Sequence, residues 1–156
     1  MEMNRLIENI IANKRNDVEK NFNRFTKRML WPSDIKEFTA ASGGDDATLG
    51  NHTFTVEAGN GENQLSQTLG SNEHIIIEGF YLPDDADYNI DYVEVDIGSA
   101  TNRIWIGDYF QNDDDGFVYV QDPLYVPPDE TVKIKFYSDS TATVTIQVLG
   151  MHYRTR

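Results

Sequence analysis

TVKIKFYS, at residues 131–138, alternates polar and apolar side chains, and ATVTIQVLGMHY, at residues 142–153, continues the alternation after a short polar turn. A period of two places successive side chains on opposite faces of a β-strand, so one face of each segment can be buried while the other meets water. These two segments therefore predict that the C-terminal part of the chain is built from strands.

The same period of two extends upstream to residue 52. It predicts six further strands, at residues 52–58, 63–69, 74–81, 90–98, 102–110 and 116–121. Clusters of Gly, Pro, Asp and Asn separate these segments, as expected of turns between short strands. Regular spacing of this kind is typical of an antiparallel sandwich or barrel. We predict a mainly β fold, an antiparallel, jelly-roll-like β-sandwich of about eight strands over residues 51–156.

The N-terminal segment follows a helical period instead. Apolar side chains recur there at steps of three, four and seven, and no Gly or Pro interrupts them. The stripe consists of Ile7, Ile11, Val18, Phe22, Phe25 and Met29. It predicts a long amphipathic α-helix over residues 4–30, which ends at Trp31-Pro32 because proline cannot continue the helical ladder. The chain then divides into an N-terminal helical arm at 1–32, a linker and first turn at 33–50, and the sandwich.

Charge is divided along nearly the same boundary. Residues 1–30 carry seven Lys or Arg against four acids, whereas residues 31–150 carry four against twenty-two. The formal net charge of the whole chain is −13, which disfavours nucleic acid as a partner of the body because phosphates would be repelled. Arg154 and Arg156 make the C-terminus basic as well. A fold that brings the two ends together would form one positive attachment pole opposite an acidic surface.

Several kinds of chemistry find no support in the sequence. The chain has no cysteine, so disulfides and Cys-ligated zinc are excluded. The strongest apolar run is Ile75–Ile77, which is far too short to predict a membrane span. The three histidines are widely spaced and no serine lies in a nucleophile motif. We therefore predict that the protein is not an enzyme, and we assign it no catalytic residue and no required cofactor.

Two groups of residues keep binding alternatives open. The acidic segment at 111–116 lacks the first and twelfth ligands of an EF-hand loop, but a looser calcium site at Asp113 and Asp115 is an alternative to an ordinary polar hairpin. The aromatic residues Trp105, Tyr109 and Tyr119 would stack on sugar rings if one face exposed them, and would otherwise belong to the core. The second hypothesis is therefore a carbohydrate-binding module, with or without calcium.

Three segments resemble strands of β-sandwich proteins on the virions of tailed viruses. They are IDYVEVDIG at 90–98, YVPPDETVKIKFY at 125–137 and TVTIQVLGMHY at 143–153. The resemblance covers about the last 80 residues and carries no functional residue with it. It implies a capsid-associated or fibre-base protein that assembles as a symmetric oligomer and joins a helical N-terminal anchor to an outward β domain.

We accordingly predict a non-enzymatic structural protein of the virion, such as a decoration, vertex or head-fibre component. Its expected partners are further copies of the chain and other virion proteins, and a carbohydrate receptor is the alternative partner. The helical stripe is predicted to bury apolar area against the partner, while basic side chains pair with acids on it. The predicted docking residues are Ile7, Ile11, Val18, Phe22, Phe25, Met29, Arg24, Lys27 and Arg28.

Overall fold

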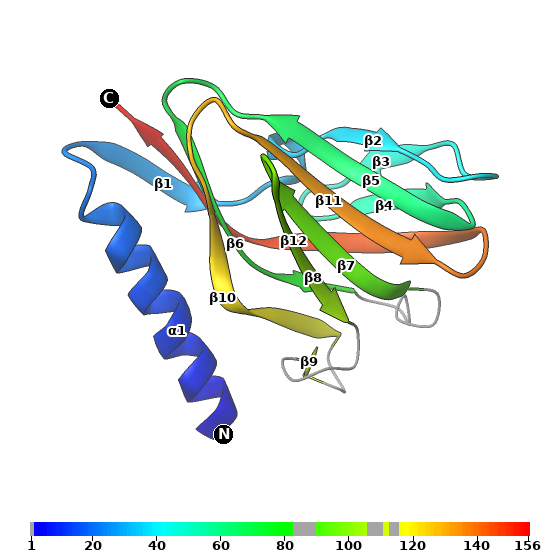
Figure 1. The fold of residues 1–156 in the computed structure, drawn as a ribbon, viewed down its shortest axis with the longest axis horizontal. Helices are drawn as coiled ribbons and strands as arrows, with labels where there is room; N and C mark the ends of the chain where they lie inside the picture. The colour runs from blue at the N-terminus through cyan, green and yellow to red at the C-terminus, as the bar shows by residue number, and fades with distance from the viewer. Residues whose placement is uncertain (1, 83–89, 106–110, 113–115) are drawn as a thin grey trace.

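The computed structural model describes residues 2–82, 90–105, 111–112 and 116–156, and its ribbon shows one helix beside two sheets (Figure 1). All strand pairings between the described residues are antiparallel. The mainly β prediction is therefore confirmed, in a sandwich-like arrangement with more strands than the predicted eight.

The larger sheet has seven strands. Their order is β3 (Ala47–Leu49), β4 (Phe54–Ala58), β12 (Ala142–Thr155), β6 (Glu73–Tyr81), β10 (Phe117–Val126) and β9 (Gln111–Asn112), and β1 (Phe25–Met29) also pairs with β12. The smaller sheet has five strands, in the order β2 (Glu37–Thr39), β5 (Gly61–Thr68), β11 (Thr131–Ser138), β7 (Ile90–Ile97) and β8 (Ala100–Trp105). The stretch predicted as linker at 33–50 thus supplies the short strands β2 and β3, after a 3-10 turn at Pro32–Asp34.

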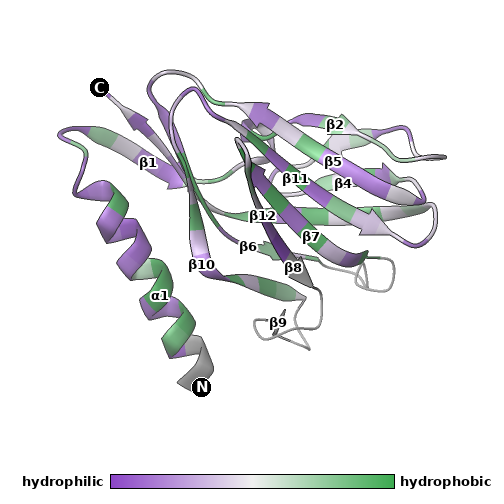
Figure 2. Cartoon of the chain, in the orientation of Figure 1, coloured by the Kyte–Doolittle hydropathy of each residue, from purple (hydrophilic) through white to green (hydrophobic). Residues whose placement is uncertain are grey.

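One hydrophobic core lies between the two sheets. Alternate residues of β11 and of the first half of β12 point into it, which is the alternation read from the sequence (Figure 2). The inward residues of these two strands are Val132, Ile134, Phe136, Val144, Ile146 and Val148. Phe54, Leu65 and Ile75 from neighbouring strands complete the same cluster, so side chains from both sheets share one core.

Helix α1 (Glu2–Glu19) packs against the larger sheet, beside β10. Val18 forms a second buried cluster with Ile76, Met151 and Tyr153, and Phe22, Phe25 and Tyr125 pack around it. Because the core covers one face of β6 and this cluster the other, residues 74–80 of β6 are all buried. That double burial explains the continuous apolar run in β6, where a half-exposed strand would alternate.

The predicted helix over residues 4–30 is wrong beyond residue 19. The chain turns at residues 20–24 and continues as β1, which pairs with the last part of β12. Val18, Phe22 and Phe25 nevertheless contact one cluster. Their helical spacing therefore reflects a shared burial site that a helix, a turn and a strand reach in succession.

The register of β6 with both of its neighbouring strands shifts at Glu78, the residue that bonds to Arg15 of α1. Ile77 of β6 pairs with Gly150 and Leu124, whereas Gly79 pairs with Leu149 and Tyr119, so Glu78 falls between two registers. Glycine is required at this bulge, because a Cβ on Gly79 or Gly150 would collide with a backbone carbonyl oxygen of the neighbouring strand.

The buried Glu78 carboxylate receives two bonds from Arg15 of α1, with Nη2 2.7 Å from Oε1 and Nε bonded to Oε2. Lys14 lies 3.6 Å from Asp122 in the irregular part of β10. Two cations of α1 therefore meet carboxylates where the sheet is irregular, and they hold the helix against the body.

No helix in the part of the chain that the structure describes has the length and apolarity needed to cross a membrane.

Candidate functional site

The last part of the basic N-terminal segment pairs with the basic C-terminal residues in one two-stranded ribbon. Thr26 of β1 pairs with Arg154 of β12, and Arg28 pairs with His152. Beyond the strands, the amide of Arg156 donates to the carbonyl oxygen of Arg24 at 3.2 Å. We call β1 with Arg24 and residues 151–156 the basic ribbon. The basic N-terminal segment therefore reaches the C-terminus only through residues 24–30, while the N-terminus itself lies at the other end of α1, away from the C-terminus (Figure 1).

The basic ribbon carries five exposed cationic side chains, which are Arg24, Lys27, Arg28, Arg154 and Arg156. Two of them are paired within the chain. Lys27 lies 2.9 Å from Glu19 at the end of α1, and Arg28 makes two bonds of 2.7 Å to Asp34. Among the described residues, no carboxylate lies within 4.0 Å of the guanidinium groups of the other three. Arg24 and Arg156 thus remain available to an acidic partner, and Arg154 lies opposite Glu73 in the strand register, where its charge helps to lower the Glu73 pKa without a salt bridge.

Two open hollows border these cations. One, of about 160 Å³, is lined by Thr26, Lys27, Arg28, His152 and Arg154. The other, of about 480 Å³, is lined by Asn23, Arg24, Phe25, Thr26 and Arg156. Both have arginines from the two segments of the basic ribbon in their walls. A carboxylate placed in either hollow would meet guanidinium groups that favour paired, planar contacts.

Two carboxylates hold the ribbon's polar groups in place. Glu73 accepts a bond from the amide of Gly70 at 3.1 Å and lies 2.9 Å from Nε2 of the buried His152. The bond to His152 lowers the pKa of Glu73, although burial opposes this. Burial also disfavours the ionised form of Asp34, but bonds from Arg28 and the Trp31 amide outweigh it and lower the pKa of Asp34. Both groups are therefore ionised at neutral pH.

The predicted docking residues fall into two sets. Ile7 and Val18 are buried within the chain itself, and Ile11, Phe22 and Phe25 are half-buried. The apolar stripe of α1 is thus used largely inside the protein. Met29 is 55% exposed, and the three predicted basic residues are also exposed. Only this second set, which comes from β1 and the residue before it, lies on the surface as a docking residue must.

The exposed Met29 is followed two residues later by a second exposed apolar side chain. Trp31 is 41% exposed and packs against His52 in a tilted arrangement, with ring centroids 4.8 Å apart. Sequence reasoning assigned no docking role to Trp31 or His152, because Trp31 reads as a helix terminator and His152 as an isolated histidine. The pairing of β1 with β12 reveals their position, because it places His152 opposite Arg28 and brings Trp31 next to the end of β1.

Of the predicted sugar-stacking residues, Tyr119 alone has a side chain that the structure describes. Tyr119 lies half-buried on β10 in the larger sheet, where burial, followed by the charges of Glu78 and Glu8, raises its pKa. Trp105 ends β8 in the smaller sheet, at the register position opposite Tyr92. Tyr109 and the calcium candidates Asp113 and Asp115 lie outside the described residues. Within those residues, no group of three or more His, Asp or Glu side chains is placed to hold a metal ion.

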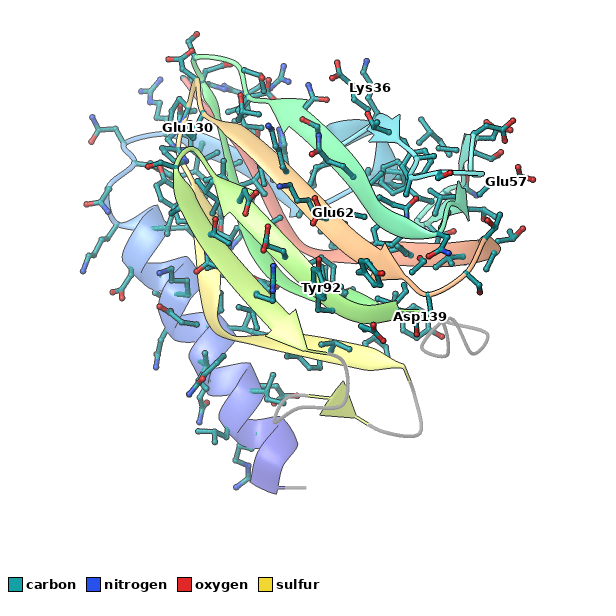
Figure 3. The ribbon with its side chains drawn as sticks, turned by 45° about the vertical axis from the view of Figure 1, so that its right-hand side comes forward. Lys36, Glu57, Glu62, Tyr92, Glu130 and Asp139 are labelled. Atoms are coloured by element: carbon teal, nitrogen blue, oxygen red, sulfur yellow. The ribbon has the colours of Figure 1, made fainter. Side chains whose placement is uncertain are left out.

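The outer face of the smaller sheet carries a second set of polar residues. The Tyr92 hydroxyl donates to Glu62 at 3.2 Å, and Figure 3 shows this pair on the sheet. The Tyr92 ring stacks on Tyr137 at 5.8 Å, and the guanidinium of Arg103 lies 4.3 Å from its centroid. Lys135 lies 3.1 Å from Asp96. These groups satisfy one another across neighbouring strands, which is expected of a solvent-facing sheet surface.

No family model matches the chain, and no curated protein matches it. The basic ribbon and the fold are therefore the features that indicate a function.

Proposed function

We propose that this chain is a non-enzymatic structural protein of a virion and that it attaches to an acidic partner through the basic ribbon. One observation carries the proposal. In a chain with a net charge of −13, strand pairing gathers five cations from residues 24–28 and 154–156, and among the described residues only Lys27 and Arg28 of these five form a salt bridge.

The strand order supports a jelly roll as the finer fold. When the eight strands from β4 to β12, without the two-residue β9, are numbered along the chain, the larger sheet contains them in the order 1-8-3-6 and the smaller in the order 2-7-4-5. Two interlocked Greek keys have this order, and jelly rolls are common in viral capsid proteins and in lectins. The strand order is therefore compatible with both a virion structural protein and a carbohydrate-binding module. The basic ribbon favours the first, because its cations suit attachment to an acidic partner.

The mechanism of attachment differs from the one that the sequence predicts. Because α1 packs on its own sheet, we assign docking to β1 and the C-terminal residues and not to a free helical arm. Arg24, Arg154 and Arg156 would pair with partner carboxylates, and Met29 and Trp31 would supply apolar area next to them. The acidic remainder of the chain would keep attached copies from clumping.

The proposal is tested by looking for the chain in particles from the organism that encodes it. Particles purified by density banding are analysed by quantitative mass spectrometry before and after a wash in high salt. We expect the chain to band with the particles at a fixed ratio to the main shell protein and to be removed by salt. Recovery of the chain only from the soluble fraction would rule the proposal out.

Carbohydrate binding is the second candidate, supported by the stacked pair Tyr92 and Tyr137 on an accessible sheet face. Its test is a glycan array probed with the wild-type chain and with Tyr137→Ala, using Phe38→Leu on the inner side of the same sheet as control. Specific binding that Tyr137→Ala removes and Phe38→Leu retains would establish it. Silence across the array would leave attachment as the sole proposal.

A further inference from the structure

Strand β1 presents one complete edge that its own sheet does not use. In the described part of the chain, β1 pairs with β12 and with no other strand. Backbone bonds join Arg156 to Arg24 and Leu30 to Gly150, at the two ends of this pairing. Hydrogen-bonded pairs alternate in an antiparallel ladder, so Thr26 and Arg28 also bond to β12.

The intervening residues must then direct their backbone groups the other way. Phe25, Lys27 and Met29 aim their N–H and C=O groups away from β12, at the free edge of β1. The side chains of Thr26, Lys27, Arg28 and Met29 are exposed, so they leave the edge accessible. The Arg28 guanidinium donates to the Met29 carbonyl oxygen at 3.1 Å, so this acceptor at the edge is already bonded. The outward amide N–H groups are the donors that a partner strand would meet.

The charges on the ribbon select the kind of chain that fits this edge. A second copy of β1 would bring Lys27 and Arg28 against the same cations and would be repelled. An extended segment with acids at alternate positions would instead place carboxylates beside Thr26, Arg28 and the hollow of about 160 Å³. Its other face would lie beside Met29, where apolar residues are favoured, and beside Lys27, whose ammonium already pairs with Glu19.

We propose that β1 binds its partner by strand addition, taking an extended acidic segment of another protein as a new edge strand. Main-chain hydrogen bonds would supply affinity, and the alternating cations would supply the preference for acids. The inference deepens the proposed function, since it names how the basic ribbon holds an acidic partner, and it rests on that function.

The test uses a labelled synthetic peptide, acetyl-EVEVEVE-amide, with the full chain and fluorescence anisotropy. Lys27→Ala and Lys27→Pro lose the same charge, but only proline removes the amide that faces the free edge, and it leaves the bonds to β12 in place. We expect Lys27→Pro to bind about tenfold more weakly than Lys27→Ala, because it loses a backbone bond and the local strand geometry.

Amide hydrogen exchange of the wild-type chain gives an independent readout that does not depend on the folding of a variant. Without peptide, the amides of Thr26 and Arg28 should exchange slowly and those of Lys27 and Met29 quickly. Saturating peptide should slow Lys27 and Met29. Unchanged exchange at these two amides in the presence of bound peptide would overturn strand addition.

The outcomes separate this inference from the proposed function. If Arg154→Glu weakens binding but the two Lys27 variants bind equally, strand addition is wrong and charge attachment stands. If Arg154→Glu and Arg24→Glu both bind the peptide as the wild type does, the basic ribbon is not an acidic-partner site. If oligo-dT competes with the peptide at equal concentration, selection for an acidic protein segment is wrong.

Discussion

At the scale of single residues, Glu78 does most to set the position of α1. Its carboxylate is 4% exposed, and a buried charge is costly unless it is paired. Arg15 supplies the pair through two bonds, and the contact raises the pKa of Arg15. The run HIIIEGFY predicts a strand here, but its Glu gives no sign of being buried. Gly79 is the one local hint, since an isolated glycine in a strand often marks a bulge.

Arg15→Ala should therefore destabilise the protein by about 2–3 kcal/mol, below the ~3–5 kcal/mol of a fully buried pair because the Arg15 side chain is 35% exposed. Urea unfolding followed by circular dichroism measures the change. Adding Glu78→Gln should recover part of the loss, since no unpaired charge remains. Lys20→Ala, which breaks a pair exposed on both sides, is the control and should cost less than about 0.5 kcal/mol.

The two carboxylates that bond to the basic ribbon, Glu73 and Asp34, should make the stability of the protein depend on pH. Glu73 and Asp34 have lowered pKa values, so their stabilising effect is complete above the ordinary carboxyl range and is lost as pH falls through their values in the folded state. The difference in thermal midpoint between the wild-type chain and Glu73→Gln should stay level from pH 7 to about 5 and narrow below about pH 4, where the midpoint of Glu73→Gln falls less steeply. Protonation of His74, whose pKa burial lowers, affects both proteins alike. An equal slope in both proteins would contradict this role for Glu73.

At the scale of elements, the N-terminal segment shows what periodicity can and cannot establish. The spacing predicts that Val18, Phe22 and Phe25 lie on one apolar stripe of a helix that docks on a partner, whereas in the structure the three contact one cluster of the chain itself and the helix ends at Glu19. A turn followed by an edge strand reaches the same cluster because β12 supplies Tyr153 and a free edge. That edge comes from the far end of the chain, so no local pattern reveals it.

Val18→Ala tests whether α1 is part of the folded body. The change removes two buried methyl groups and should cost about 1.6 kcal/mol of unfolding free energy. Leu6→Ala on the same helix is the matched control, because Leu6 is 52% exposed and its loss should cost less than about 0.5 kcal/mol. Equal stabilities of the two variants in chemical denaturation would mean that α1 does not pack on the sheet in solution.

At the scale of the whole molecule, the regular spacing of short alternating segments predicts a mainly β sandwich or barrel, and the alternate apolar residues of 132–136 and 144–148 do share one core. The order of the strands cannot be predicted from this alternation, because each sheet contains neighbouring strands that are distant in sequence. The same limit applies to the site. The charge split predicts a basic docking region, and only the pairing of β1 with β12 shows that Arg24, Arg154 and Arg156 belong to one surface.

The central claim is that these cations hold the protein on its partner. Its most direct test is rebinding of the purified chain to salt-stripped particles, with Arg24→Glu/Arg154→Glu/Arg156→Glu compared against Arg5→Glu/Lys36→Glu/Lys133→Glu. Both triple variants change the net charge equally, and all six positions are exposed. We predict that the ribbon variant binds at least about tenfold more weakly than the control variant. Equal binding by the two variants would contradict the claim.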